Sequence, residues 1–193
     1  MNPLQQLEHL RTRFASTERF DWEPEWPAPE TSQRAGVLIA LQDGPQGLEL
    51  LLTRRTDHLY HHPGQISFPG GRMEEHDADE TAAALREAEE EIGLPVNQVE
   101  IIGSLPDYIT SSAFRVSPVV GYVNRTFTPQ LDAFEVAELF SVPLQHVINP
   151  SALQRHRVNR GATQRHFFAL PYDGRFIWGA TAGMLAMLAA FLR

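Results

Sequence analysis

Three glutamates lie close together in the segment Arg86-Glu87-Ala88-Glu89-Glu90-Glu91. Glu87, Glu90 and Glu91 are spaced i, i+3 and i+4, so a helix would place their carboxylates on one face. Carboxylate oxygens bind hard cations such as Mg²⁺, which can bridge phosphate oxygens and lower the pKa of an attacking water. The hexapeptide alone nevertheless favours a simpler interpretation, a solvated acidic face of a helix.

The flanking residues reverse that preference. The segment Phe68-Pro69-Gly70-Gly71 lies upstream and is joined to the helix by an acidic loop. Glycine lets backbone amides and carbonyls approach a metal or a phosphate closely because it has no side chain. The segment Ile92-Gly93-Leu94 then ends the helix at a turn. A glycine loop followed by an acidic helix therefore indicates a metal site.

This arrangement resembles the Nudix hydrolases, whose box is Gly-x5-Glu-x7-Arg-Glu-U-x-Glu-Glu-x-Gly-U, with U apolar. The second half of the box matches Arg86, Glu87, Ala88, Glu90, Glu91, Gly93 and Leu94. The first half departs, because Arg72 and Ala78 fall where the box has Gly and Glu. One extra loop residue restores the pattern with Gly71 as the box glycine and Asp77 in the acidic position.

The resemblance implies a reaction, a cofactor and a set of roles. The reaction is hydrolysis of a phosphoanhydride with Mg²⁺ or Mn²⁺. Glu87, Glu90 and Glu91 would be the metal ligands, joined by the backbone carbonyl of Gly70. Arg86 would orient the glutamates by ion pairs, since it stands four residues before Glu90.

A narrower resemblance concerns the substrate. Three segments are similar to the signature of the coenzyme A pyrophosphatase branch: Leu51-Leu52-Thr53-Arg54-Arg55-Thr56, Gly64 and Phe68-Pro69-Gly70-Gly71. Thr56 replaces Ser or Ala of that signature, and Tyr60 replaces an Arg that could meet a substrate phosphate. The likeness implies cleavage of coenzyme A or acyl-coenzyme A, with Arg54, Arg55 and Gly71 at the substrate. Because strand residues alternate, only one of the two arginines should face the site.

Other interpretations stay open. The substrate could instead be ADP-ribose or another nucleoside diphosphate derivative, or the chain could be a non-catalytic regulator that binds a ligand on the same fold. The regulator is disfavoured because all three helix glutamates are present. Glu135 and Glu138 are candidates for a further acidic group, although ordinary surface carboxylates are the better interpretation.

Two further groups suggest different chemistry. A zinc site of His58, His61 and His62 would need an ordered set of three or four ligands, so a pocket or surface role is preferred. Ser111-Ser112 lacks the Gly-x-Ser-x-Gly context of a nucleophilic serine.

The predicted secondary structure around these residues indicates an α/β fold. The central helix is expected over residues 77–91, capped by Asp77 and by Glu80 three residues later. Strands are expected at 36–41, 48–53, 65–68, 99–103, 116–123 and 136–142, with a last hairpin at 166–170 and 175–178. An amphipathic helix over residues 1–14 and a buried apolar helix over 180–192 complete the pattern. The resemblance implies the Nudix α/β/α sandwich, in which a mixed β-sheet lies between helices.

Composition narrows the classes of function. The 193 residues carry a net charge of −8, which argues against a nucleic-acid partner and leaves a small-molecule substrate. No cysteine is present, which excludes thiol nucleophiles and thiolate metal sites and fits a reducing, cytoplasmic compartment. No membrane span is expected, because the apolar C-terminal run is short for one. Residues 1–34 are expected to form an N-terminal helix and connector, and 35–193 the Nudix domain. The oligomeric state stays open, with a homodimer as one option.

Overall fold

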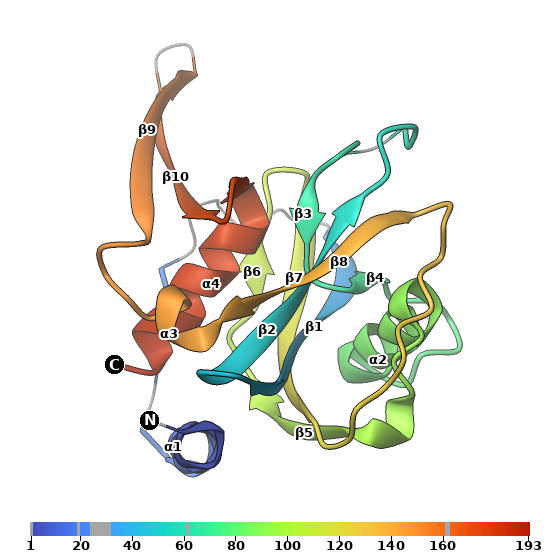
Figure 1. The fold of residues 1–193 in the computed structure, drawn as a ribbon. Coiled ribbons are helices and arrows are strands. Elements are labelled where there is room, and N and C mark those ends of the chain that lie inside the picture. The colour runs from blue at the N-terminus through green and yellow to red at the C-terminus, as the bar shows by residue number, and fades with distance from the viewer. Residues whose placement is uncertain (1, 19, 24–31, 61, 161–162) are drawn as a thin grey trace.

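A mixed β-sheet forms the centre of the molecule (Figure 1). The computed structural model describes residues 2–18, 20–23, 32–60, 62–160 and 163–193, without the side chains of residues 158–165. Eight strands join in this sheet within those ranges: β1 (Gln33–Gly44), β2 (Gly47–Arg55), β3 (Ile66–Ser67), β4 (Gly70–Arg72), β5 (Val99–Ser104), β6 (Tyr108–Ile109), β7 (Phe114–Val123) and β8 (Val136–Pro143).

The pairing of β1 makes the sheet mixed. β1 runs parallel to β7, with Val37 opposite Pro118, and antiparallel to both β2 and β4. β4 pairs with the first half of β1, at Val37 and Gly70, while β2 pairs with its second half, at Leu41 and Leu50. β2 also pairs with β3 and β8. β2 and β4 therefore succeed each other along one side of β1, and the glycine loop enters where the partner changes.

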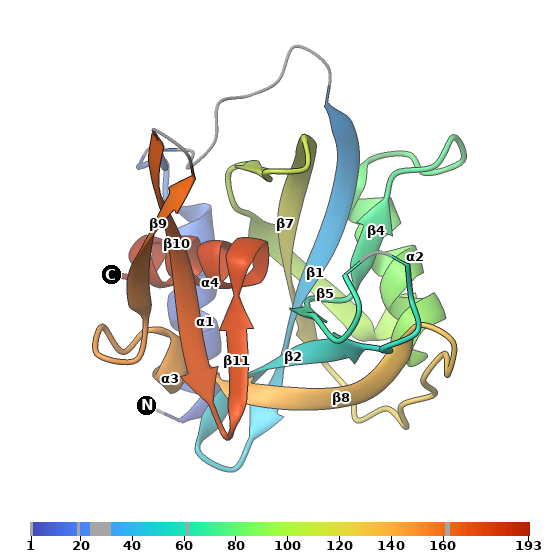
Figure 2. The ribbon, with the colours of Figure 1, turned by 90° about the horizontal axis from the view of Figure 1, so that it is seen from above.

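Helices cover both faces of this sheet (Figures 1 and 2). α2 (Glu80–Ile92) packs on one face, where Leu38 and Ala40 of β1 join Ala84 and Ala88 of the helix in one apolar cluster. The other face packs against α1 (Pro3–Ala15) and α4 (Gly179–Phe191), and the intervening strand residues such as Ile39 belong to that larger core. The alternation of side chains along β1 thus separates two cores, as a strand buried on both faces requires.

A second, three-stranded sheet lies beside α4 (Figure 2). It consists of β9 (Gln154–Arg160), β10 (Thr163–Tyr172) and β11 (Arg175–Trp178), and a short helix, α3 (Leu144–Val147), precedes it. The last predicted hairpin corresponds to β10 and β11, which turn at Asp173 and Gly174, both with positive φ. β9 was not predicted, because its polar and basic sequence lacks the apolar alternation of a half-buried strand.

The predicted fold is confirmed, with one local correction at the start of α2. Asp77 was predicted to cap this helix, and that prediction is wrong. The cap is Asp79, whose extended backbone lets its carboxylate accept the amide of Ala82 at 2.8 Å. Asp77 lies before the helix, and its side chain accepts the amide of Glu74 instead.

The helices at the two ends of the chain agree with their predicted positions. α1 starts from an Asn2 cap, and α4 is buried along almost its whole length. None of the helices in the described part of the chain is long and apolar enough to cross a membrane. The division at residues 34 and 35 stays a prediction, and residues 24–31 of the predicted connector lie outside the described ranges.

Candidate active site

Glycines bring α2 against the sheet and the glycine loop. A Cβ on Gly36 would lie 2.0 Å from the carbonyl oxygen of Glu80, so only glycine allows this approach of β1 to the helix. Gly70 has φ 152°, and a Cβ there would lie 2.5 Å from the carbonyl oxygen of Gly36. A Cβ on Gly71 would lie 2.3 Å from Oε1 of Glu87. The glycine pair therefore lies directly against the acidic face of the helix.

Glu91 is the most buried carboxylate of this cluster, with 5% of its surface exposed. The amide of Gly70 donates a hydrogen bond to it, yet its Oε2 atom is buried without a partner. Burial, followed by the charge of Glu87, raises the pKa of Glu91 to about 8. Arg55 approaches Oε1 at 3.9 Å and only partly offsets this effect. A buried carboxylate oxygen with no partner is what a cation site presents before the cation binds.

Glu87 and Glu90 are held by Arg86. The Arg86 guanidinium donates to Oε1 of Glu87 and to Oε2 of Glu90, both at 3.0 Å. Burial raises the pKa of Glu87, while Glu90 is largely exposed. The predicted contacts between Arg86 and the glutamates are therefore present. They turn the side chain of Glu90 toward the Arg86 guanidinium and away from Glu91.

The guanidinium of Arg86 is itself fixed by the loop before the helix. Asp77 accepts two hydrogen bonds from it, and the carbonyl oxygen of Arg72 accepts a third at 3.1 Å. The Asp77 carboxylate is 3% exposed, and the hydrogen bonds from Arg86 lower its pKa. With one loop residue inserted, Asp77 thus stands at the acidic position of the box and contacts the box arginine.

Of the two arginines in β2, Arg55 faces the cluster. Its guanidinium lies 3.3 Å from Glu135 and 3.9 Å from Glu91. Glu135 is held there by its backbone, since its carbonyl accepts the amide of Thr56 at 2.9 Å. The same loop docks on the end of α2 through the amide of Asp132, which donates to the carbonyl of Glu91. The charge of Glu135 contributes to the raised pKa of Glu91.

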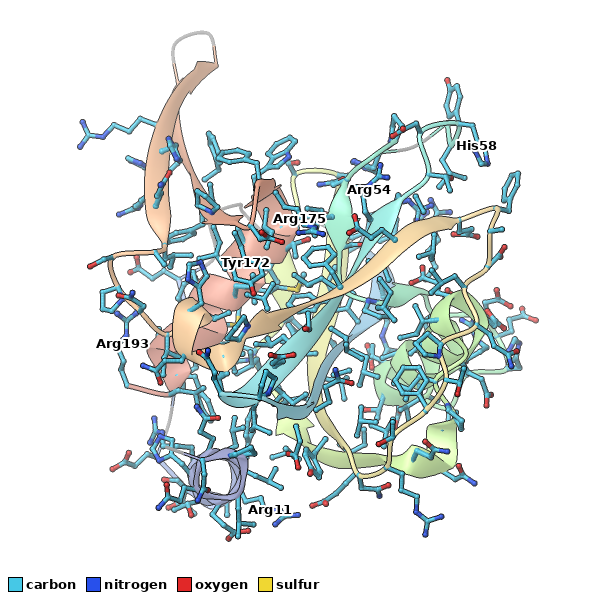
Figure 3. The ribbon with its side chains drawn as sticks, viewed as in Figure 1. Arg11, Arg54, His58, Tyr172, Arg175 and Arg193 are labelled. Carbon is cyan, nitrogen blue, oxygen red and sulfur yellow. The ribbon has the colours of Figure 1, made fainter. Side chains whose placement is uncertain are left out.

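Arg54 points to the other face of β2. It pairs with Glu138 of β8 and with Asp57, both at 3.5 Å. Glu138 also pairs with Arg175 of β11, which lies near Arg54 in Figure 3. Arg54 and Glu138 therefore belong to an ion-pair network between the two sheets, and of the two acidic candidates only Glu135 lies at the cluster.

The acidic side chains around the glycine loop do not converge on one point. In the part of the chain that the structure describes, no three side chains of His, Cys, Asp or Glu lie close enough together to hold a metal. His58 packs on Phe134 and His62 lines a cavity, while His61 lies outside the described residues. Figure 3 shows His58 in the loop after β2.

A cavity of about 470 Å³ opens beside the glycine loop. Val37 lines it, whereas the neighbouring Gly36 packs on α2, so the cavity lies on the α4 side of β1. Its walls are mainly apolar and include Phe68, Phe167 and Trp178. The lining residues with polar side chains include His62, Gln65, Ser67, Tyr108, Thr110, Ser111, Ser112, His166 and Thr181.

Sequence reasoning missed this cavity because its walls come from distant segments that share no local pattern. Ser111 and Ser112 lie in its lining, and the Ser112 hydroxyl contacts that of Thr110 at 3.0 Å. Such apolar cavities with a few polar groups are typical of sites for small organic molecules.

Comparison with known proteins agrees with this geometry. The NUDIX domain family matches residues 32–164. An uncharacterized Nudix hydrolase named NudL from Yersinia enterocolitica is 40% identical over 158 residues, which is 82% of this chain and 80% of that protein. NudL from Yersinia pestis is 38% identical over 159 residues, 82% of this chain and 79% of its own length.

Solved structures show the same fold at lower identity. A Nudix hydrolase from M. smegmatis, RenU, has a TM-score of 0.51 at 22% identity and covers 60% of this chain and 73% of its own. A C. elegans Ap4A hydrolase complex has a TM-score of 0.50 at 21% identity, covering 57% of this chain and 80% of its own. With the box glutamates on α2, the glycine loop against them and a family match over most of its length, this chain belongs to the Nudix hydrolase family.

Proposed function

We propose that this Nudix hydrolase cleaves the phosphoanhydride of coenzyme A or acyl-coenzyme A with the help of Mg²⁺ or Mn²⁺. Water adds at one phosphorus and the bridging P–O bond breaks, which gives 3′,5′-ADP and 4′-phosphopantetheine or its acyl form. The general reaction follows from the family. The choice of coenzyme A rests on the signature in β2 and the glycine loop, and on the cavity beside it.

The cation site would be formed by Glu87, Glu90 and Glu91, with the carbonyl of Gly70 as a further ligand. The unpaired Oε2 of Glu91 and the raised pKa values of Glu87 and Glu91 fit this role, because all three indicate missing positive charge. A bound divalent ion supplies charge to the phosphates and acidity to a water. Glu90 has to turn from Arg86 to take part, which its exposed position permits.

Protein residues around the glutamates would hold the substrate and the cluster in place. Arg86 keeps Glu87 oriented while Asp77 fixes the guanidinium from behind. Arg55 is the cation that could contact a phosphate, since its side chain faces the cluster. Gly71 would let the diphosphate of the substrate approach the protein backbone closely, because glycine has no Cβ. Arg54 is a weaker candidate for substrate contact because Glu138 already pairs with it.

One observation carries the choice of substrate. Ser67 and Phe68 line the cavity, and only Pro69 separates them from the glycine pair, so a substrate held at the glutamates could place an organic arm in it. The walls of the cavity are mainly apolar, so they suit the pantetheine arm of coenzyme A. They suit the second ribose of ADP-ribose less well, because its several hydroxyl groups would lose their hydrogen bonds to water there. ADP-ribose or another nucleoside diphosphate derivative is the second candidate. A non-catalytic regulator is disfavoured by the intact set of glutamates.

The lack of cysteine supports a cytoplasmic location. The enzymatic test is product identification. The purified chain is incubated with Mg²⁺, Mn²⁺ or EDTA and a panel of coenzyme A, ADP-ribose and dinucleoside polyphosphates, and products are separated by chromatography. We expect 3′,5′-ADP and 4′-phosphopantetheine only with metal.

Matched variants locate the activity. Glu90→Gln and Glu91→Gln should lower turnover by orders of magnitude, whereas Glu89→Gln on the exposed side of the same helix should not. Full activity in the first two variants would remove these residues from the proposed site. Cleavage of another compound in the panel, with coenzyme A untouched, would leave the family assignment and overturn the proposed substrate.

A further inference from the structure

A row of aromatic rings leads from the cavity onto the surface of the second sheet. Trp178 and Phe167 both line the cavity, and their ring centroids lie 6.2 Å apart. Phe167 stacks on His156 at 5.2 Å, and His156 meets Phe176 edge-on at 6.3 Å. These four residues, Trp178, Phe167, His156 and Phe176, are called the aromatic row below.

Strand register places the aromatic row on one face. Phe167 is paired with His156, while Trp178 and Phe176 are paired with Ala169 and Pro171, which share the face of Phe167. The opposite face packs on the core through Leu170 and Ile177, which are both fully buried. The aromatic row therefore lies on the outer face of the second sheet.

The outer end of the aromatic row is open to solvent. Phe176 is 51% exposed and Trp178 is 49% exposed. Large apolar side chains that gather on a surface, rather than stand singly, mark a binding site. Because two of the four rings also form a wall of the cavity, the row and the cavity make one continuous apolar path.

We infer that the aromatic row binds an acyl chain attached to the far end of the substrate's organic arm. This inference rests on the proposed function. If the diphosphate lies at the glutamates and the arm fills the cavity, the far end of the arm points out of the cavity. In coenzyme A this far end is the thiol, which carries the acyl group in acyl-coenzyme A. A chain leaving past Trp178 meets the rings of Phe167, His156 and Phe176 in turn. The preferred substrate is therefore acylated coenzyme A rather than the free thiol.

The kinetic test measures kcat/KM for coenzyme A and for its acetyl, octanoyl and lauroyl thioesters. Each methylene that leaves water should improve kcat/KM by about two- to fourfold, up to the end of the row. Phe176→Ser should flatten this dependence when each value is divided by that variant's own value for coenzyme A. Phe176→Leu should keep most of it, because an apolar side chain remains. Leu4→Ser, at an exposed apolar residue on α1, is the control and should behave as the wild type.

A binding measurement separates this inference from the proposed reaction. S-octanoyl-pantetheine and pantetheine contain no phosphoanhydride, and their affinities can be compared by tryptophan fluorescence. We expect the octanoyl form to bind at least tenfold more tightly, and Phe176→Ser to remove most of that difference. If coenzyme A is not hydrolysed but this difference is found, the proposed function fails and the acyl site stands.

Two results would overturn the inference. One is hydrolysis of coenzyme A with no dependence on acyl length and no gain in affinity from the octanoyl group. The other is a stable dimer in sedimentation velocity that Phe176→Ser dissociates, since the aromatic row would then be covered by a second copy of the chain.

Discussion

Asp77 and Arg86 form a paired contact between the loop and the helix of the Nudix box. Nε of Arg86 lies 3.1 Å from Oδ1 of Asp77, and Nη2 lies 3.0 Å from Oδ2. The same guanidinium holds Glu87 and Glu90, so one residue links the acidic loop to two proposed metal ligands. The geometry of the glutamates therefore depends on a carboxylate outside the helix.

We expect Asp77→Asn to impair both stability and turnover. The variant loses a charge-assisted pair in a mostly buried place, which should cost about 1–3 kcal/mol of unfolding free energy. Turnover should fall about ten- to a hundredfold, since misplaced catalytic groups are costly even at small displacements. Denaturant unfolding and steady-state kinetics measure the two effects.

The pH dependence of this loss has a definite sign. Arg86 lowers the pKa of Asp77 in the folded protein, so the stabilisation is present above the unfolded pKa and disappears as the pH falls through the folded one. The difference between wild type and Asp77→Asn should therefore vanish in acid. Asp79→Asn is the control, because Asn caps a helix as well as Asp does. An equal loss in both variants would contradict the role given to Asp77.

Glu91 gives the opposite pH dependence in the metal-free protein. Burial raises its pKa to about 8, above the ordinary glutamate value of 4.5, so the folded state binds the proton more tightly than the unfolded chain. Stability from this group is present below the unfolded pKa and is lost as the pH rises from about 4.5 to about 8. The change should amount to a few kcal/mol, given roughly 1.4 kcal/mol per unit of pKa.

Thermal melts of wild type and Glu91→Gln in EDTA, between pH 5 and 9, measure this effect. The wild type should lose stability relative to the variant as the pH rises. Added Mg²⁺ should restore the wild type at pH 8 but not Glu91→Gln, because binding to the folded state alone stabilises it. Parallel curves for the two proteins would show that Glu91 titrates normally.

Local patterns predicted the parts of the site that lie on one element. Glu87, Glu90 and Glu91 follow helical spacing, so their common face was readable from the sequence. Which of Arg54 and Arg55 faces the cluster depends on how β2 sits in the sheet, and alternation alone left both open. The cap of α2 was misassigned because Asp77 and Asp79 are both suitable residues, and the turn of the loop decides between them.

The rest of the site depends on contacts between distant segments. The cavity joins Val37, Tyr108 and Trp178, and no spacing rule connects them. Glu135 reaches the cluster because its loop is held by Thr56 and by the end of α2. Such long-range packing becomes visible only in the folded structure.

The two arginines of β2 should differ sharply in function. Arg55→Gln removes the cation that faces Glu91 and Glu135, so kcat/KM should fall about 10- to 150-fold if its contact with a phosphate is worth about 1.5–3 kcal/mol. Arg54→Gln should change kcat/KM by less than about threefold, because Arg54 points away from the glutamates and pairs with Glu138 and Asp57 instead. Equal losses in the two variants would contradict the different orientations assigned to them.

The 3′-phosphate distinguishes coenzyme A from dephospho-coenzyme A and from ADP-ribose. A phosphate is best recognised by a guanidinium fork, and the signature of the coenzyme A branch has an arginine where this chain has Tyr60. We therefore expect only weak discrimination against dephospho-coenzyme A in the wild type, although coenzyme A should still be preferred to ADP-ribose. Tyr60 is 93% exposed, so replacing it removes little packing. Tyr60→Arg should raise the ratio of kcat/KM for coenzyme A over dephospho-coenzyme A by about tenfold or more.

The control for charge is Tyr60→Gln, which should leave this ratio unchanged. A competition assay with coenzyme A, dephospho-coenzyme A and ADP-ribose, with products separated by chromatography, measures all three preferences at once. Because the substitution adds one cation to the loop after β2, a gain restricted to coenzyme A would place its 3′-phosphate beside that loop. A gain shared equally by all three substrates would instead reflect general attraction of anions to an acidic protein. If ADP-ribose is consumed first by the wild type, the coenzyme A proposal fails whatever Tyr60→Arg does.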